Sequence, residues 1–298
     1  NLNTNGLTLE NGARIPDSSK VVITGPCSSL QLLELTSGAE LTLDNTAVVT
    51  MNNADLRNAG LMNGNGLVNF IGNQDNELSS TGLITAPITI DNKQLHLGAN
   101  SNTASIALIN NSNVSLGTYN LNMIGTTATL MADSVNFFVT NDTGRLNRYV
   151  ADQEMLYPVG TSIGSYTPVS ITNSGNEDYV KVRVAAGVEP SLLTGNVDRT
   201  WYIADSAQAG LNLSCTARWT ASEEQAGFDR NSCYISHYTL CPVPLNCATG
   251  FYDGAPMGAA NGTDAFTISR NGLGNFRSNA FIVTSRRSEE RRVGKECL

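Results

Sequence analysis

Four cysteines lie in one stretch of the chain: Cys215, Cys233, Cys241 and Cys247. No CxxC pair or histidine cluster accompanies them, so neither zinc nor any other cofactor is expected. An oxidising compartment and two disulfides are the better interpretation. We pair Cys215 with Cys233 and Cys241 with Cys247, although the sequence allows other connectivities. Cys27 is left over, either as a buried free thiol or as a contact to another subunit.

The chain has only 2 histidines, which limits acid–base chemistry. His96 lies between Leu95 and Leu97, so strand alternation turns it away from the face that these leucines bury and predicts a solvated residue. His237 lies among the cysteines. No Ser or Cys nucleophile has an evident base beside it. The chain is therefore not predicted to be an enzyme.

Paired carboxylates could still serve a glycosidase or a lyase. The candidates are Asp75 and Glu77 in "NQDNELSS", Asp91, and Glu223 with Glu224. Asp75 and Glu77 would share one side of an extended strand, but a polar turn with solvated carboxylates is expected there. No Asp-rich repeat indicates calcium and no glycine loop indicates phosphate. A polysaccharide-degrading β-helix enzyme remains an alternative.

Aromatic side chains offer a different chemistry, the stacking of sugar rings. Trp201, Trp219, Tyr234 and Tyr238 could form such a platform. Both tryptophans also lie in strand-like runs, which fits a buried core equally well. A carbohydrate-binding surface adhesin is therefore the first alternative function.

The composition indicates an extracellular all-β protein. Charged residues make up only 15% of the 298 residues, and the formal net charge is −8. A nucleic-acid partner is not expected because it requires a basic face, and no apolar run is long enough to cross a membrane. We expect a secreted or cell-surface protein whose Asn1 follows a removed signal peptide.

The end of the chain has a different composition. Residues Arg287 to Cys297, "RSEERRVGKEC", match the translation of a common short-read sequencing adapter residue for residue. We therefore treat 287–298 as an artefact and exclude it from reasoning about the fold. The natural sequence is expected to continue differently after about residue 286.

Residues 1–140 carry a loose repeat of short alternating runs, separated by Asn, Gly, Ser, Thr and Asp. Alternation places both members of each apolar pair on one face of a short strand. A right-handed β-solenoid and an antiparallel sandwich both fit, and the small turns favour a β-solenoid-like domain. The pairs are Leu7/Leu9, Val21/Ile23, Leu30/Leu32, Leu41/Leu43, Val49/Met51, Ile88/Ile90, Leu95/Leu97, Ile106/Leu108, Val114/Leu116 and Leu121/Met123.

A solenoid has exposed ends, which must be capped or used for assembly. The first residues, "NLNTNGLTL", form either a cap coil or a strand that pairs with a neighbouring subunit. Asn1, Leu7, Leu9 and Cys27 are therefore the candidate assembly contacts.

Residues 141–286 have more aromatic residues and longer alternating runs. "YVKVRVAAG" and "AFIVTS" are typical strands, Asn173–Asn176 breaks two strands, and "ASEEQAGFDR" indicates a short turn or helical bulge. An antiparallel β-sandwich is expected.

This second half resembles a β-sandwich module of secreted Bacteroidota proteins. The resemblance rests on Tyr157–Thr161 (Tyr-Pro-Val-Gly-Thr, where Phe usually comes first), Tyr166–Val169 (Tyr-Thr-Pro-Val), Arg199–Trp201 (Arg-Thr-Trp) and Trp219. It implies export by the type IX secretion system. It also implies O-glycosylation at Asp-Ser-(small apolar) sites, which would be Ser134 and Ser206. The stretch with four cysteines departs from the usual pattern.

Together these features predict an extracellular structural protein, a subunit of a bacterial surface filament or fibre. Its main partner would be further copies of itself, joined head to tail through β-strands. Surface glycans are a second possible partner, and no catalytic residue, cofactor or metal is expected.

Overall fold

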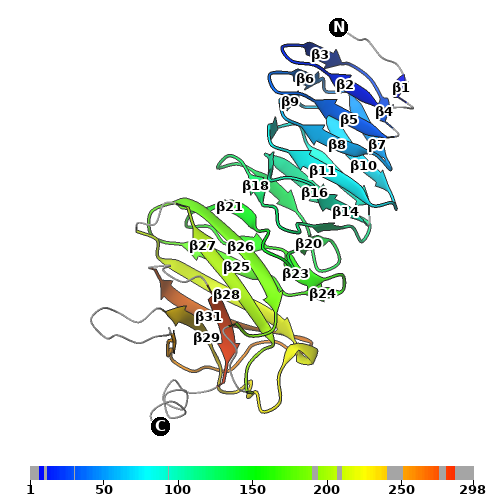
Figure 1. Cartoon of the computed structure of the whole chain (residues 1–298). Helices are drawn as coiled ribbons and strands as arrows, with labels where there is room; N and C mark the ends of the chain where they lie inside the picture. Colours follow the sequence, from blue (N-terminus) through cyan, green and yellow to red (C-terminus); the bar gives the residue numbers. More distant parts are fainter. Residues whose placement is uncertain are drawn as a thin grey trace, which may run out of the picture. The chain divides into compact units, whose positions relative to one another are not determined.

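The structure is a computed structural model that describes residues 7–9, 12–29, 31–92, 94–189, 194–206, 210–239, 251–274 and 280–285. It is all-β, and within these ranges it contains no α-helix. The chain forms two compact units (Figure 1). The solenoid unit comprises Asn1–Tyr149 and Ser162–Gly164, and the second unit comprises Val150–Thr161 and Ser165–Leu298.

The solenoid unit is built from coils of three short strands, one on each of three parallel sheets, here called faces 1, 2 and 3. Face 1 consists of β1 (Leu7–Leu9), β4 (Cys27–Ser29), β7 (Val48–Asn52), β10 (Leu67–Gly72), β13 (Ile88–Asn92), β16 (Ser105–Leu108) and β19 (Thr129–Met131). Face 2 consists of β2 (Ala13–Ile15), β5 (Leu32–Leu35), β8 (Asp55–Asn58), β11 (Asn76–Ser80), β14 (Leu95–Leu97), β17 (Asn113–Ser115) and β20 (Phe137–Val139). Face 3 consists of β3 (Lys20–Ile23), β6 (Glu40–Leu43), β9 (Leu61–Gly64), β12 (Leu83–Ile84), β15 (Ser101–Thr103), β18 (Leu121–Met123) and β21 (Leu146–Val150).

Alternation along these strands explains the core. On β6, Leu41 and Leu43 are fully buried, while Glu40 before them and Thr42 between them are half-exposed. Each fully buried leucine stabilises the fold by about 1.5–3 kcal/mol relative to an exposed one. No single coil encloses a core, so this stabilisation requires neighbouring coils to stack. The predicted β-solenoid is confirmed.

Inward residues of successive coils lie in register and form columns along each face. On face 1 the pairing runs without a break through one column, here called the face 1 column, and its members are all apolar or Cys: Cys27, Val49, Val68, Ile88, Ile106 and Leu130. The backbone of Leu7 pairs with Cys27 at the start of this column. Because similar residues stack from coil to coil, the solenoid unit has a continuous apolar core enclosed by hydrogen-bonded sheets.

Two sequence-based details differ from the structure. Leu32 is half-exposed, and Leu33 and Leu35 are the buried residues of β5, because the strand starts one residue later in phase than expected. The other member of that predicted pair, Leu30, lies outside the described residues. The last coil is completed by β21, which pairs with β18, so the solenoid unit extends to Tyr149 instead of ending at about residue 140.

Polar and small residues hold the corners between faces 2 and 3. Asn58 is buried, accepts a hydrogen bond from the amide of Gly60, and donates to Ser80 Oγ at 3.0 Å. A Cβ on Gly82 would overlap the carbonyl oxygen of Gly60 in the preceding coil. The stack of coils therefore requires glycine at this corner.

The second unit contains antiparallel sheets. One sheet has the order β22 (Met155–Tyr157), β25 (Val169–Asn173), β28 (Leu213–Thr220) and β31 (Ala265–Leu273). The other antiparallel pairs link β26 (Asp178–Ala186), β27 (Arg199–Asp205), β32 (Ala280–Thr284), β29 (Tyr234–Thr239) and β30 (Phe251–Tyr252) in that order. The remaining elements are β23 (Val159–Ser162), β24 (Ser165–Tyr166) and the 3₁₀ turn η1 (Ala221–Glu223).

Strands predicted in this half are present, and so is the helical bulge, which is η1. The turn at Asn173–Asn176 does not form a hairpin, because β25 and β26 pair with different strands. Asn173 instead fixes a crossover, since its side chain accepts hydrogen bonds from the amides of Gly175 and Asn212. The antiparallel part of the predicted fold is thus confirmed at the level of these sheets.

Candidate functional site

The first candidate site is the pair of open ends of face 1. β1 and β19 are its outermost strands, and no strand among the described residues pairs with the outer side of either one. Such edges expose backbone N–H and C=O groups that can pair with another chain. β2 and β3 are likewise the outermost strands at the start of faces 2 and 3.

The open edges differ in charge. β2 carries Arg14 and β3 carries Lys20, whose side chains are 67% and 79% exposed and form ion pairs with Glu34 and Glu40 of the next coil. Edge cations discourage strand addition. β1 (Leu-Thr-Leu) and β19 (Thr-Leu-Met) carry no charge at all. Face 1 alone therefore has an uncharged edge at both of its ends.

The predicted assembly contacts have different outcomes. Leu7 and Leu9 do lie in an edge strand, β1, while Asn1 lies outside the described residues. Cys27 is only 3% exposed and belongs to the face 1 column, between Leu7 and Val49. Burial raises the pKa of its thiol. The hypothesis that Cys27 contacts another subunit is therefore wrong, and it is a buried free thiol.

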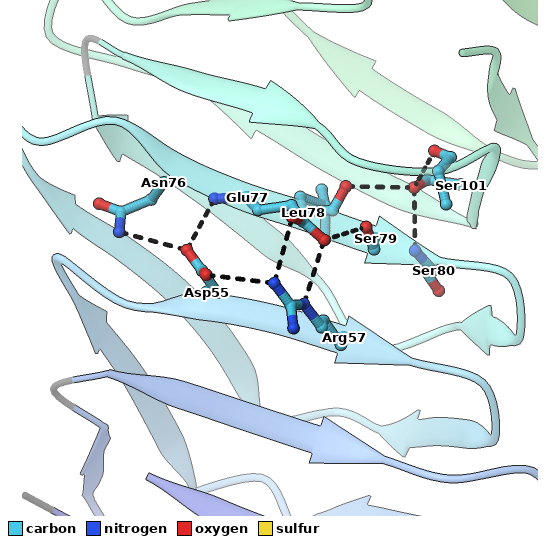
Figure 2. Close-up of polar contacts among 9 residues, drawn as sticks. Asp55, Arg57, Asn76, Glu77, Leu78, Ser79, Ser80 and Ser101 are labelled. Carbon is cyan, nitrogen blue, oxygen red and sulfur yellow. Dashed lines mark hydrogen bonds and ion pairs between the residues drawn. The ribbon is translucent and has the colours of Figure 1, made fainter. Parts of the chain in front are cut away.

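The second candidate site is a polar ladder on the outward side of face 2 (Figure 2). Register places Arg14 beside Glu34, and Glu34 beside Arg57. Arg57 then contacts Glu77 of the next coil through both carboxylate oxygens, at 3.2 and 3.4 Å, and Asp55 at 3.8 Å. Charges of opposite sign thus alternate along the face.

Glu77 is the best-held carboxylate of this ladder. Partial burial acts to raise its pKa, but hydrogen bonds from Ser79 and Arg57 and the charges of Arg57 and His96 outweigh burial. The pKa of Glu77 therefore lies below its ordinary value, and the carboxylate is ionised. Gly98 makes room for it, since a Cβ there would overlap the Glu77 side chain.

Asp55 is also engaged, because it accepts a hydrogen bond from the amide of Glu77 at 3.0 Å (Figure 2). Asp75 does not pair with Glu77 as a catalytic couple would, but contacts His96 Nδ1 at 2.7 Å. His96 is half-exposed and points away from the buried Leu95 and Leu97, as predicted. Asp55, Asp75 and Glu77 each bind a group of a neighbouring coil, so these carboxylates join one coil to the next.

Sequence reasoning singled out Asp75, Glu77 and His96 but missed Asp55 and Arg57. The polar turn with solvated carboxylates that was expected at Glu77 is wrong, because Glu77 lies on β11 and its side chain is 22% exposed. The available signal was the spacing, because hydrogen bonds between side chains of neighbouring coils join residues 16 to 25 positions apart. Asparagines follow the same rule: Asn122 donates to Asn102, and Asn147 donates to Asn122. Amide ladders of this kind stabilise stacked strands.

The predicted aromatic platform is not a surface. Trp201, Trp219 and Tyr234 are 1%, 0% and 3% exposed, so they cannot stack on a sugar. Trp219 packs edge-on against Phe228, and its indole donates to Glu224 at 2.8 Å. Of the four proposed residues only Tyr238 is half-exposed. Alternation along β28 buries Trp219, whereas Trp201 lies in a run of four buried residues on β27, so both faces of that strand are covered there.

The predicted disulfide between Cys215 and Cys233 is also wrong. Both are buried free thiols: Cys215 lies on β28, while the backbone of Cys233 pairs with Gly258. Burial raises the pKa of Cys215 to about 12 and that of Cys233 to about 11. Closeness in sequence did not imply closeness in the fold. Cys241 and Cys247 lie outside the described residues.

The remaining carboxylate candidates have structural roles. Glu223 forms a buried ion pair with Arg199 at 2.8 Å and also accepts a hydrogen bond from the amide of Thr220. Glu224 holds Arg230 at 2.7 Å. Asp91 accepts a hydrogen bond from Asn110 on the solenoid surface. These contacts secure turns and coils.

His237 is buried beside a second ion pair. Its ring stacks on Phe281, and its backbone amide donates to Asp253, which holds Arg270 at 2.7 and 2.6 Å. Arg270 also donates to the carbonyl oxygen of Ile235. This cluster joins β31 to β29, strands of different sheets.

Both predicted glycosylation residues are exposed. Ser134 lies in a turn held by Asp133, which accepts hydrogen bonds from the amides of Val135 and Asn136. Ser206 follows β27, and its amide donates to Asp178. Their accessibility is what a modification would require, and the modification itself stays a prediction.

Across the described ranges, no three His, Cys, Asp or Glu side chains gather as metal ligands would. Nor does that part of the chain form a helix long and apolar enough to cross a membrane. Searches for similar proteins among family models, curated proteins and solved structures all find no match. The resemblance to the Bacteroidota sandwich module therefore stays a prediction.

Proposed function

We propose that this protein is an extracellular structural subunit, which assembles head to tail into a surface filament through β-strand contacts. The observation that carries the proposal is the pair of open, uncharged edges at the two ends of face 1. A parallel sheet with one free edge at each end can add a copy at either end. Such a contact is heterologous, and when it does not close it produces a filament.

The ladders support a long-lived structural role. Hydrogen-bonded asparagines and ion pairs join neighbouring coils. Each such interface adds to the stability of the stack. The low content of charged residues, 15%, suits extended β contacts between subunits.

We further propose that the sheets of the second unit pack face to face as a β-sandwich head. Two buried hydrogen bonds support this packing: Tyr157 on β22 donates to the carbonyl oxygen of Val180 on β26, and Trp201 on β27 donates to that of Thr167. The motifs behind the Bacteroidota resemblance supply Tyr157, Thr167 and Trp201. Secretion by the type IX system and a cell-surface location are part of the same proposal.

The two alternative functions have less support. An adhesin would need exposed aromatic side chains, and three of the four candidates are buried. A polysaccharide-degrading enzyme would need free converging carboxylates, whereas Asp55 and Glu77 are each held by hydrogen bonds or ion pairs. A structural role is compatible with buried aromatic side chains and with carboxylates that are already bonded to neighbouring residues.

Electron microscopy of the purified full chain, over a series of concentrations, tests the proposal. We expect fibres with one regular subunit repeat, and light scattering after size exclusion should show species larger than a dimer. Dispersed monomers at every concentration would contradict the filament function. In that case glycan-array binding, with Tyr238→Ala as a comparison, would test the adhesin.

A further inference from the structure

Asparagine followed by glycine is a pair of residues that can react with its own backbone. Glycine has no Cβ, so its amide nitrogen can approach the side-chain carbonyl carbon of the preceding asparagine. The approach requires a side chain and a backbone that are free to move, and the fold therefore decides which pair reacts. Of the six Asn-Gly pairs in the chain, four lie entirely within the described residues: Asn63-Gly64, Asn65-Gly66, Asn261-Gly262 and Asn271-Gly272.

We propose that Asn271 is a site of spontaneous deamidation, at which water converts the asparagine to a mixture of aspartate and isoaspartate. The modification adds one negative charge to the second unit. It is independent of the proposed filament function, because it needs only the folded chain and water.

Asn271 lies in an irregularity of β31. The pairing of β31 with β28 is interrupted there, because Asn271 and Gly272 together lie opposite the single residue Ser214. This arrangement is a β-bulge, in which the extra residue is left out of the ladder. Gly272 has a φ of 72°, in the left-handed region that glycine adopts readily. Both residues of the pair are exposed to water.

The reacting groups of Asn271 are not held in place. Among the described residues, none forms a hydrogen bond or an ion pair with its side chain. A Cβ on Gly272 would meet no described residue within 4 Å apart from its chain neighbours. The side chain of Asn271 and the amide nitrogen of Gly272 therefore have room to approach each other.

Stacked coils hold an Asn-Gly pair of the solenoid unit that is otherwise similar. Asn65 is exposed, but its side chain donates a hydrogen bond to Asn45 at 3.0 Å. The amide nitrogen of Gly66, which would have to attack, donates to the carbonyl oxygen of Leu43 at 3.2 Å. Gly66 is also buried. Reaction at Asn65 thus requires two neighbouring coils to separate locally.

The other two pairs are held as well. Asn63 donates a side-chain hydrogen bond to Glu40 at 3.1 Å. Asn261 has an exposed side chain, but its backbone exchanges two hydrogen bonds with Thr267, both at 2.9 Å. These contacts must open before either pair can react, whereas the side chain of Asn271 has no such contact with the described residues.

The reaction has two steps. In the first, the amide nitrogen of Gly272 gives up its proton and bonds to Cγ of Asn271, while the Cγ–Nδ2 bond breaks and ammonia leaves with that proton. In the second, water adds to one of the two carbonyl carbons of the resulting succinimide ring and breaks the bond from that carbon to the ring nitrogen. Ring opening at Cγ gives aspartate, and ring opening at the backbone carbonyl carbon of Asn271 gives isoaspartate. No oxidation or reduction occurs, and water is the only co-reactant.

Conversion would change the second unit in two ways. Each event makes a chain with a formal net charge of −8 more negative by one unit. Isoaspartate also routes the main chain through the side-chain carbons, which lengthens β31 by one atom just before the buried Leu273. Leu273 pairs with Leu213, so the longer backbone should loosen this end of the sheet.

Peptide mapping over time tests the proposal. The full folded chain is incubated at mildly alkaline pH in heavy-oxygen water, so that ring opening during the incubation labels the product. Mass spectrometry then measures the product at each of the four described Asn-Gly pairs. We expect Asn271 to be converted at least about tenfold faster than Asn65, because Asn65 must first open locally. Earlier conversion of another of the four pairs, or no conversion at all, would overturn the proposal.

Denaturant separates the effect of the fold from that of the sequence. In the unfolded chain the four pairs should be converted at comparable rates, because no contact then distinguishes them. A preference for Asn271 as large as in the folded protein would contradict the role of the bulge.

Glutamine variants provide a second readout. Asn271→Gln should stop the fastest conversion, because the longer side chain would have to close a larger ring. Asn65→Gln is the matched control and should leave that conversion unchanged. Isoelectric focusing should therefore show a more acidic form that accumulates in the parent chain and in Asn65→Gln but not in Asn271→Gln. Accumulation at the parent rate in Asn271→Gln would contradict the assignment.

Discussion

The indole Nε1–H of Trp201 donates a hydrogen bond to the backbone carbonyl oxygen of Thr167 at 3.1 Å, and both residues are fully or almost fully buried. Two of the sequence motifs singled out in the second half, Arg-Thr-Trp and Tyr-Thr-Pro-Val, are thus joined by one bond. This bond links β27 to the segment just before β25 inside the second unit.

Trp201→Phe should destabilise the second unit by about 2–4 kcal/mol, because it leaves a buried carbonyl oxygen unpaired and removes part of a core side chain. Urea unfolding followed by circular dichroism measures the change. Gln153→Ala, at an exposed side chain of the second unit, is the control and should change stability by less than about 0.5 kcal/mol. A similarly small effect of Trp201→Phe would show that this bond does not matter.

Gly82→Ala should destabilise the solenoid unit by more than about 2 kcal/mol, since the new methyl group would overlap the backbone of Gly60 and force two coils apart. Thermal unfolding measures the loss. Gly258→Ala is the matched control because its Cβ would meet only Ile268, at 3.7 Å. Equal effects of the two substitutions would contradict the close stacking at this corner.

The stability of the solenoid unit should fall in acid partly through Glu77. Its pKa in the folded chain lies below the ordinary value of 4.5, so its contribution is complete above that value and is lost as pH falls through the folded pKa. Between about pH 6 and pH 3, the free energy of unfolding of Glu77→Gln should depend less steeply on pH than that of the parent chain.

Urea titrations at several pH values measure these slopes. Ser79→Ala removes one hydrogen bond to Glu77 and leaves the ion pair with Arg57, so its slope should be intermediate. Identical slopes for all three proteins would show that Glu77 does not contribute to the acid sensitivity.

The thiols of Cys27, Cys215 and Cys233 should resist alkylation while the chain is folded. All three are buried, and burial raises their pKa, to about 12 for Cys215 and about 11 for Cys233. Peptide mapping after iodoacetamide treatment should find them labelled only when denaturant is present. A Cys215–Cys233 bridge in peptides from the non-reduced protein would contradict the structure.

Local alternation made the solenoid predictable: Leu41 and Leu43, or Ile88 and Ile90, reveal one face of a strand without any knowledge of the neighbours. Which residues of a strand face inward was harder to predict. The sequence analysis placed Leu32 in the core instead of Leu33, because both residues fit an apolar run. The polar ladder was not predicted, because Arg57 and Glu77 are one full coil apart in sequence and come together only when neighbouring coils stack.

Features of the second unit depended more on contacts between distant segments. Trp201 and Trp219 lie in strands, but sequence alone left open which face of each strand is covered. Cys215 and Cys233 follow each other closely in sequence, yet they lie on a central strand and in a bridge to Gly258. The burial of the tryptophans and the separation of the two cysteines both depend on which strands pair and which sheets pack together, and no local sequence pattern specifies this.

Each coil of the solenoid unit touches only the coil before and the coil after it, and the same column residues recur at every step. A coil from the middle could therefore be duplicated or deleted without altering either terminal strand. Each insertion would lengthen the unit by one strand spacing, roughly 4.8 Å. In the proposed filament, the distance between the two ends of the solenoid unit could thus change by whole steps while the terminal strands stay the same.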